Sequence, residues 1–264
     1  MTTPTVILSI AGLDPAGGAG LLADLKTVAA QGAHGVGVLT ATTAQNTVGV
    51  KSFHPLPPEV VTAQLDALHE DLTIAAAKTG MLGTGAIVAA VADWLEANWR
   101  APLVVDPVLV ASSGHLLLEP DAIATLKARL LPLATVVTPN LPEAAELVGF
   151  PVETLDDMAR AARELHALGA RYALVKGGHL SGDATDALFD GVEIYHFPGA
   201  RIAIETHGTG CTLSAALATL LGRGVAVGDA VAQAKAYVRD AMARAMQVGK
   251  GKRLLGHLPA ARDE

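Results

Sequence analysis

The chain has few of the residues that would indicate a disulfide-linked, membrane-spanning or nucleic-acid-binding protein. Its 264 residues include one cysteine, Cys211, which excludes an internal disulfide and a zinc site made of cysteines. Aromatic residues make up only 3% of the chain and charged residues 17%. The formal net charge is -7 without any cluster of lysine and arginine, which argues against nucleic acid or an anionic membrane as partner. No apolar run is long enough to span a bilayer and no signal peptide is recognisable, so we expect a reducing, cytoplasmic setting.

The residues that are abundant favour a compact globular protein. Hydrophobic residues make up 51% of the chain, and 27 glycines and 14 prolines supply many turns. A chain of this length can bury a large core without disulfides. We find no linker, low-complexity tract or internal repeat, and we predict a single domain over residues 1–264.

Short apolar runs alternate with Ala- and Leu-rich stretches along most of the chain. Runs at 5–12 and 35–45 predict buried strands, and the stretch 19–32 between them predicts a helix. Further strands are predicted at 73–80, 102–107, 135–140 and 172–178, and further helices at 55–72, 86–99, 121–131, from 141, 155–169, 209–222 and 227–247. This alternation predicts a mainly parallel sheet with helices on both faces.

Residues 183–205 break the alternation. Two turn dipeptides, Asp190-Gly191 and Pro198-Gly199, separate short strand-like runs there and indicate antiparallel hairpins. The predicted α/β sheet therefore carries a small antiparallel extension in its C-terminal third.

The segment GTGCT, residues 208–212, leads into a predicted apolar helix. Gly208 and Gly210 permit a turn whose backbone N–H groups point to one spot, and the helix N-terminus adds partial positive charge there. Such a site would bind an anion, and it would lower the pKa of Cys211, which could then act as a base or nucleophile. The structural alternative is a capped turn with an inert, buried cysteine, and these residues alone leave both interpretations open.

Polar residues follow several predicted strands, at the edge where parallel sheets bind ligands. Asn140 and Glu143 could hold a hydrated Mg²⁺ that carries substrate phosphates. The same two residues could instead form a helix capping box. Asp106 precedes a proline, which is also common in turns, and Lys176 could balance phosphate charge.

The glycine-rich segment GLDPAGGAG, residues 12–20, matches neither common nucleotide-binding fingerprint. It lacks the G-x-G-x-x-G pattern of dinucleotide-binding folds and the Gly-Lys-Ser/Thr ending of a P-loop. The nine histidines show no H-E-x-x-H spacing, which argues against a catalytic zinc.

Eight motifs occur in order between about residue 6 and about residue 255. They are SIAGLDPAGGAGLLADLKT (9–27), AQNTVGV (44–50), KTGML (78–82), VVDPVLVASSG (104–114), TPNLPEA (138–144), VKGGH (175–179), HGTGCTLSAALA (207–218) and VGKG (248–251). Together they resemble the hydroxymethylpyrimidine/phosphomethylpyrimidine kinases of thiamine biosynthesis, in the ribokinase-like superfamily. The resemblance implies a ribokinase-like three-layer α/β fold and a homodimer. It also implies ATP- and Mg²⁺-dependent phosphorylation of 4-amino-5-hydroxymethyl-2-methylpyrimidine and then of its monophosphate.

The resemblance implies a role for each matching residue. Cys211 stands where related sugar kinases carry a catalytic aspartate, and the anion hole for the transferred phosphoryl group would comprise Gly208, Thr209 and Gly210. The pyrimidine pocket would comprise Gly12, Asp24, Gln45, Met81 and Val108. The nucleotide would contact Asp106, Asn140, Lys176, Gly177, Gly178 and His179, and the metal ligand would be Glu143.

Three positions depart from the commonest family pattern. Ala16 stands where serine is frequent, and Ser112 and His115 stand where lysine and aspartate are often seen. These changes concern contacts near the phosphate of the second substrate. Two alternatives stay open: a pyridoxal or pyridoxine kinase on the same scaffold, and a catalytically silent pyrimidine-binding protein. Gln45 and Met81 favour the aminopyrimidine.

Overall fold

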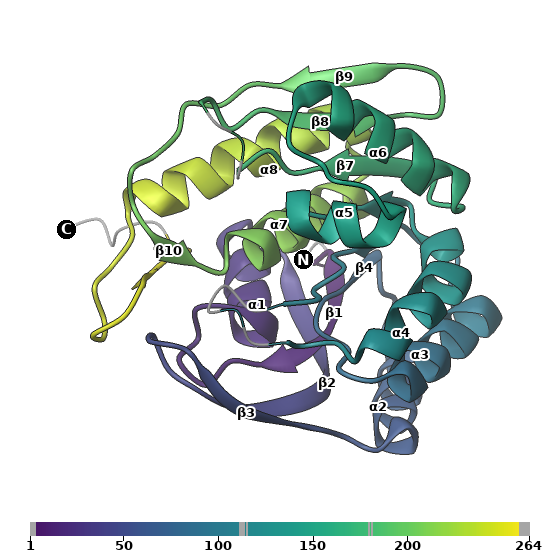
Figure 1. Ribbon diagram of the computed structural model, residues 1–264. Coiled ribbons are helices and arrows are strands. Elements are labelled where there is room, and N and C mark those ends of the chain that lie inside the picture. The colour runs from purple at the N-terminus through teal and green to yellow at the C-terminus, as the bar shows by residue number, and fades with distance from the viewer. Residues whose placement is uncertain (1–3, 111–113, 115, 179, 181, 259–264) are drawn as a thin grey trace.

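One sheet forms the centre of the molecule (Figure 1). The computed structural model describes residues 4–110, 114, 116–178, 180 and 182–258, and within them this sheet has nine strands in the order β3-β2-β1-β4-β5-β6-β7-β8-β9. The strands are β1 (Val6–Leu13), β2 (His34–Gln45), β3 (Val50–Pro55), β4 (Ala76–Thr79), β5 (Leu103–Val105), β6 (Val136–Val137), β7 (Tyr172–Val175), β8 (Asp186–Phe189) and β9 (Ile194–Phe197). Pairing is parallel from β2 through β7, and β3, β8 and β9 pair antiparallel at the two edges.

Alternate residues of the central strands pack into two different helix layers. Val104 packs into one core with helices α1 (Gly20–Ala30), α7 (Thr209–Gly222) and α8 (Val227–Ala243). Its neighbours Leu103 and Val105 pack into the other core, with the helices α2 (Pro58–Asp71), α3 (Gly85–Asn98), α4 (Pro120–Thr125), α5 (Leu141–Val148) and α6 (Leu155–Ala167). Because side chains alternate across a strand, both faces of the sheet are covered. The predicted three-layer α/β architecture is confirmed.

The sequence missed one antiparallel strand and misplaced several ends. Strand β3 was not predicted, because its link to β2 is a turn held by Asn46, whose Oδ1 accepts from the N–H groups of Val48 and Gly49 at 2.9 and 3.3 Å, without a recognisable hairpin dipeptide. The hairpin at Asp190-Gly191 is confirmed as β8–β9. The prediction of a further strand after Pro198-Gly199 is wrong, and the predicted helix 121–131 consists of α4 followed by a π-helical turn, Leu126–Leu130.

The order of the strands places a crevice beside β1. Strand β2 lies on one side of β1 and β4 on the other, so the crossovers diverge there, and ligands of open parallel sheets bind at the carboxyl end of such a point. A second, two-stranded sheet, β10 (Thr206–His207) with β11 (Arg253–Leu254), brings the C-terminal segment to the same region.

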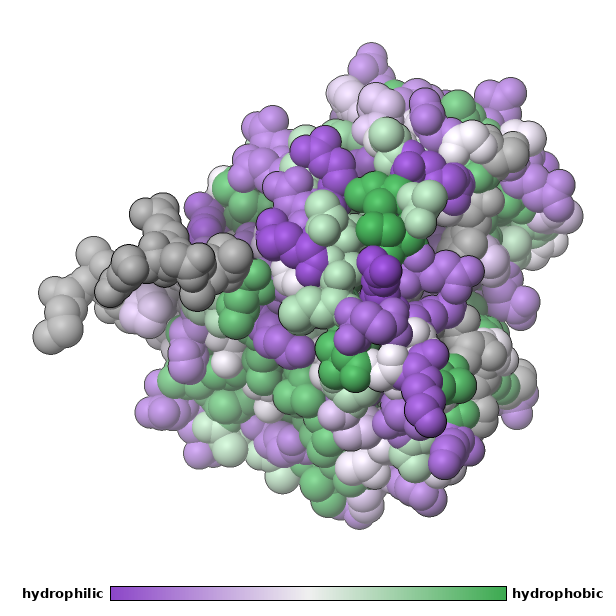
Figure 2. Space-filling view, turned by 90° about the vertical axis from the view of Figure 1, so that its left-hand side faces the viewer, coloured by the Kyte–Doolittle hydropathy of each residue, from purple (hydrophilic) through white to green (hydrophobic). Residues whose placement is uncertain are grey.

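The surface that carries β10 and β11 is mixed in character. Figure 2 shows hydrophilic and hydrophobic side chains interspersed over this face, as is usual for protein surfaces. Among the described helices none is long and apolar enough to cross a membrane.

Candidate active site

A cavity of about 790 Å³ opens at the carboxyl ends of the central strands. It brings together twelve of the predicted site residues: Gly12, Gln45, Met81, Asp106, Val108, Asn140, Glu143, Lys176, Gly208, Thr209, Gly210 and Cys211. Three other predicted residues, Asp24, Gly177 and Gly178, do not line it. His179, Ser112 and His115 lie outside the described residues.

Helix α7 begins at the wall of this cavity. Its N-cap, Gly208, has φ 85°, and a methyl group there would lie 1.8 Å from the carbonyl oxygen of Gly18, so the position accepts only glycine. No described side chain caps the helix, so the N–H groups of its first turn are available to an anion. The predicted glycine turn at a helix N-terminus is confirmed as a structure.

A lysine–aspartate pair lies directly beside that turn. The Nζ of Lys176 is 3.0 Å from Oδ1 of Asp106, and a methyl group at Gly210 would lie 3.1 Å from the same Nζ. Burial alone would raise the pKa of Asp106, but the neighbouring ammonium groups hold it below its ordinary value. The cavity therefore combines a lysine ammonium with a helix N-terminus, two features that both attract phosphate.

The N-terminus of helix α5 forms another part of the wall. Oδ1 of Asn140 accepts from the N–H of Glu143 at 2.9 Å, and Oε2 of Glu143 accepts from the N–H of Asn140 at 2.8 Å. The two residues thus form the capping box that the sequence offered as the structural alternative. Burial raises the pKa of Glu143 to about 7, and Lys176 opposes that shift in part.

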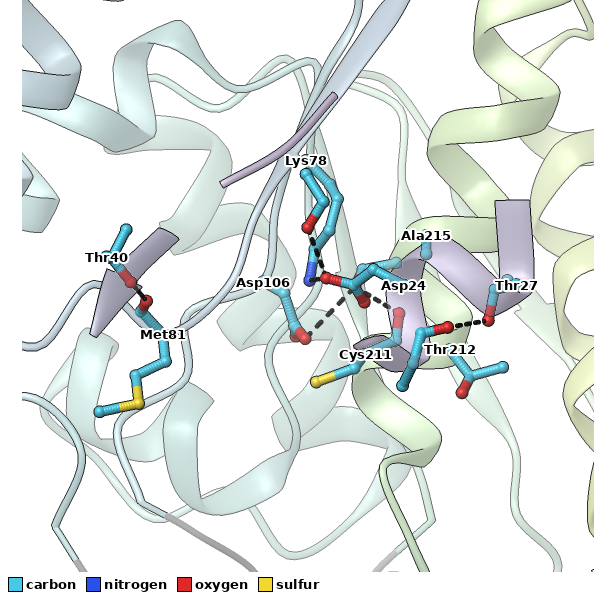
Figure 3. A network of polar contacts seen from close by, with 12 residues as sticks. Asp24, Thr27, Thr40, Lys78, Met81, Asp106, Cys211, Thr212 and Ala215 are labelled. Carbon is cyan, nitrogen blue, oxygen red and sulfur yellow. Dashed lines mark hydrogen bonds and ion pairs between the residues drawn. The ribbon is translucent and has the colours of Figure 1, made fainter. Parts of the chain in front are cut away.

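Cys211 lies on the first turn of α7 and is only partly exposed. Its sulfur points away from the helix, toward the side where Asp106 and Met81 lie (Figure 3). The prediction of a lowered pKa is wrong, because burial outweighs the helix N-terminus and raises the pKa of the thiol to about 12. The lysine ammonium of Lys78 and the backbone N–H of Gly20 oppose this shift.

Asp24 lies beneath the cavity rather than in its wall. Its carboxylate is fully buried, and Oδ2 accepts from the Nζ of Lys78 at 3.0 Å and from the Oγ of Ser9 at 2.6 Å. A side chain that is shielded in this way does not touch a ligand in the cavity. The structure therefore does not place Asp24 where the predicted pyrimidine contact requires it.

Residues 14–256 match the family model described as phosphomethylpyrimidine kinase. The chain belongs to this family. The relative from Streptomyces coelicolor named hydroxymethylpyrimidine/phosphomethylpyrimidine kinase is 48% identical over 250 residues, which cover 94% of this chain and 93% of the relative. The thiamine biosynthesis bifunctional protein ThiED of Geobacter sulfurreducens is 47% identical over 97% of this chain, which spans 53% of that longer protein.

Solved structures place this phosphomethylpyrimidine kinase family member in the ribokinase-like fold. The pyridoxal kinase from Staphylococcus aureus in complex with pyridoxal superposes with a TM-score of 0.91 at 34% identity, over 100% of this chain and 97% of its own. Members of the family are phosphotransferases, so the chain is a kinase.

The sequence missed three polar residues of the kinase site. Lys78 is buried below the floor of the cavity. The sequence feature that could have identified it is a lysine within the otherwise apolar run AAAKTG. Asp14 and His207 line the cavity, and His207 Nε2 lies 3.2 Å from Asp14 Oδ2 and 2.8 Å from Gln45 Nε2. These contacts join segments far apart in the chain, so local spacing carries no signal for them.

Gly177 and Gly178 shape the turn after β7 instead of lining the cavity. A methyl group at Gly177 would lie 1.8 Å from the carbonyl oxygen of Thr185, and the Gly177 N–H donates to Oδ1 of Asp186 at 2.7 Å. Gly178 is exposed. Their contact with a nucleotide stays a prediction.

Proposed function

We propose that this kinase transfers the γ-phosphoryl group of ATP to the hydroxymethyl group of 4-amino-5-hydroxymethyl-2-methylpyrimidine, and then phosphorylates the monophosphate. The observation that carries the proposal is the meeting of Lys176, the first turn of α7 and Cys211 on one wall of the cavity. Phosphoryl transfer needs mainly positioned positive charge at the phosphate, and this wall supplies it.

The two ends of the cavity suit two different ligands. Asp106, Lys176 and the N-terminus of α5 form a charged end, which fits the phosphates of a nucleotide. Met81 and Val108 belong to a small apolar cluster with Ala41 and Leu117, which fits the face of an aromatic ring. The amide of Gln45 lines the same cavity, beside His207, and can pair with a ring nitrogen and an exocyclic amine.

In this assignment the N–H groups of Gly208, Thr209 and Gly210 hold the transferred phosphoryl group. Cys211 is a neutral thiol at neutral pH in the free protein, because its pKa is raised to about 12. In a loose transition state the bond between the alcohol oxygen and phosphorus has barely formed, so the alcohol is still only weakly acidic. The position of the proton acceptor therefore matters more than its basicity. Cys211 could accept that proton only as a thiolate, so its own proton would first have to pass to a phosphate oxygen of the nucleotide or to water.

We propose Mg²⁺ as the metal and Glu143 as its carboxylate. Mg²⁺ commonly binds through one or two carboxylates, substrate phosphates and waters. Within the described residues no group of three His, Cys, Asp or Glu side chains could hold a metal alone, and Glu143 at the charged end of the cavity fits a site completed by phosphates. When bound, the ion would supply neutralisation of phosphate charge.

A pyridoxal kinase activity is the second candidate. The structural likeness to the Staphylococcus aureus pyridoxal kinase supports it, and that protein has also been solved with AMP-PCP, an ATP analogue, at a TM-score of 0.90. Pyridoxal also carries a hydroxymethyl group on a flat ring, so shape alone does not separate the two. The homodimer, the cytoplasmic setting and the single-domain organisation stay predictions.

Product analysis by mass spectrometry tests the proposal. The kinase is incubated with ATP, Mg²⁺ and either the hydroxymethylpyrimidine or pyridoxal. We expect the pyrimidine monophosphate and then the diphosphate, with a kcat/KM above that for pyridoxal. A kcat/KM for pyridoxal far above that for the pyrimidine would overturn the assignment, and pyrimidine binding without ATP turnover would indicate a silent binding protein.

A further inference from the structure

Lys78 is the one charged residue of β4, and its side chain is fully buried. A methyl group at Gly80 would lie 2.9 Å from its Nζ, so the small residue there leaves room for the ammonium group. Figure 3 shows the nitrogen of Lys78 directed at Asp24, with the side chains of Asp106 and Cys211 below it in the view. Replacing a buried ion pair by apolar residues is often neutral or stabilising, so stability alone is a weak reason for this pair.

Among the described residues, the side-chain hydrogen-bond partner of the Lys78 ammonium group is Asp24. Oδ2 of Asp24 is shared between Lys78 and Ser9, and among the described residues the other oxygen, Oδ1, has no hydrogen-bond partner. An ammonium group carries three N–H donors in a tetrahedral arrangement, so it can serve Asp24 and still present positive charge elsewhere. Asp24 holds Lys78 from the α1 side, and in Figure 3 the carboxylate of Asp106 and the sulfur of Cys211 lie below the Lys78 nitrogen.

The charge of Lys78 reaches the sulfur of Cys211. Charged groups from four segments act on it or on its immediate neighbours: Lys78 on β4, Asp24 on α1, Asp106 after β5 and Lys176 after β7. Of these, Lys78 has the largest favourable effect on a thiolate, and Asp24 and Asp106 oppose it. The backbone N–H of Gly20, at the start of α1, also favours the thiolate.

We propose that Lys78 is a positioning residue whose buried ammonium group, anchored by Asp24, stabilises negative charge on the Cys211 sulfur from beneath the cavity. Lys78 keeps its own proton and touches no substrate. It limits the effect of burial on the thiol, so that Cys211 can release its own proton to a phosphate oxygen of the nucleotide or to water and then, as the thiolate, accept the proton of the substrate alcohol. The catalytic consequence rests on the proposed function, whereas the effect on the thiol does not.

Alkylation of Cys211 measures this effect without any turnover. The chain has one cysteine, so the rate of reaction with neutral iodoacetamide reports this thiol alone. Below the thiol pKa the rate follows the thiolate fraction, and one pKa unit changes it about tenfold. At pH 8.5 we expect Lys78→Met to react at least about fivefold more slowly than the wild type, and Asp24→Asn to react at least about fivefold faster. Lys51→Met, which removes an exposed lysine outside the cavity, is the matched control and should leave the rate unchanged.

The two variants are expected to change the alkylation rate of Cys211 in opposite directions, which distinguishes an effect of charge from an effect of loosened packing. Both changes disturb the same buried pair, so a packing effect would change access to Cys211 in the same direction. Wild-type or faster alkylation of Lys78→Met overturns the proposal. If Lys78→Met does not fold, as judged by circular dichroism, Asp24→Asn decides, and a rate equal to or below the wild type overturns the proposal.

Kinetics then distinguish failure of this inference from failure of the proposed function. With the pyrimidine and ATP, we expect Lys78→Met to lower kcat more than it changes KM and to move the rising limb of the kcat–pH profile to higher pH. Expected alkylation rates without any pyrimidine phosphorylation by the wild type would sink the proposed function alone. Normal turnover with unchanged alkylation in both variants would sink the role of Lys78 alone.

Discussion

The molecule contains two lysine–aspartate pairs with the same separation and different depths. Lys176 and Asp106 are 3.0 Å apart with side chains 14% and 2% exposed, whereas Lys78 and Asp24 are 3.0 Å apart with both side chains 0% exposed. The first lysine reaches the cavity, so it can exchange part of its contact with Asp106 for a phosphate. The second lysine is sealed by protein and can act only through its neighbours. Depth, and not distance, decides which pair can bind a ligand.

The largest expected difference between the pairs concerns stability. Lys78→Met leaves the Asp24 carboxylate buried without its cation, which typically costs about 3–5 kcal/mol. Lys176→Met leaves Asp106 with hydroxyl donors from Thr138 and Ser214 at 3.2 and 3.4 Å and with the charge of Lys78 nearby, so we expect a smaller loss of about 2 kcal/mol. Urea unfolding of both variants at pH 7.5, followed by circular dichroism, measures the two free energies of unfolding. Equal losses would contradict the distinction by depth.

For activity we expect the opposite order, with a larger loss for Lys176→Met than for Lys78→Met. Lys176→Met removes the ammonium group beside the first turn of α7, and we expect kcat/KM to fall about 10²–10³-fold, the usual effect of losing one group that stabilises transition-state charge. Lys176→Arg is the control that keeps the charge and changes the geometry. Steady-state kinetics at a temperature where every variant is folded measure the effect. A loss smaller than that of Lys78→Met would show that the buried pair carries the phosphate chemistry.

Cys211 connects the two pairs, because the charges of both Lys78 and Lys176 interact with its thiol. We expect Cys211→Ala to lower kcat about 10²-fold, since proton transfer by a placed side chain contributes at least that much. The free energy of unfolding should change by less than about 1 kcal/mol, because a small and partly exposed side chain is lost. Single-turnover kinetics and urea unfolding are the measurements. A near-normal kcat would show that the first turn of α7 acts without the thiol.

Much of the fold was predictable because local patterns determine it. Buried apolar runs, glycine turns and amphipathic stretches identified the parallel strands and both helix layers, and Asp190-Gly191 identified one hairpin. Strand β3 has no such pattern, since its partly exposed residues alternate only weakly and its turn is held by an asparagine side chain. Edge strands of this kind are stabilised mainly by the neighbouring strand.

The site was predictable where a residue follows a strand or begins a helix, and less so below that surface. Asp106, Lys176 and the glycine turn come to the cavity because carboxyl ends of parallel strands share one edge. The depth of Asp24 and the raised pKa of Cys211 depend on Lys78 and on burial by several segments. A motif match assigns a residue to a neighbourhood, whereas burial decides whether its side chain faces the ligand or the core.

The smallest expected effect is a pH dependence of stability beside the cavity pair, Lys176 and Asp106. Glu143 lies near Lys176 and Asp106, and burial raises its pKa from the ordinary 4.5 to about 7 in the folded protein. A carboxyl group with a raised folded-state pKa stabilises the fold fully below pH 4.5, and this contribution is lost as the pH rises through 7. We therefore expect the wild type to lose on the order of 2 kcal/mol relative to Glu143→Gln between pH 5 and pH 8, without nucleotide or metal. Glutamine can keep the bond to the Asn140 N–H, so the difference isolates the charge. Urea unfolding at both pH values decides, and a wild type that gains stability relative to Glu143→Gln as the pH rises would mean that Lys176 outweighs burial at this carboxyl group.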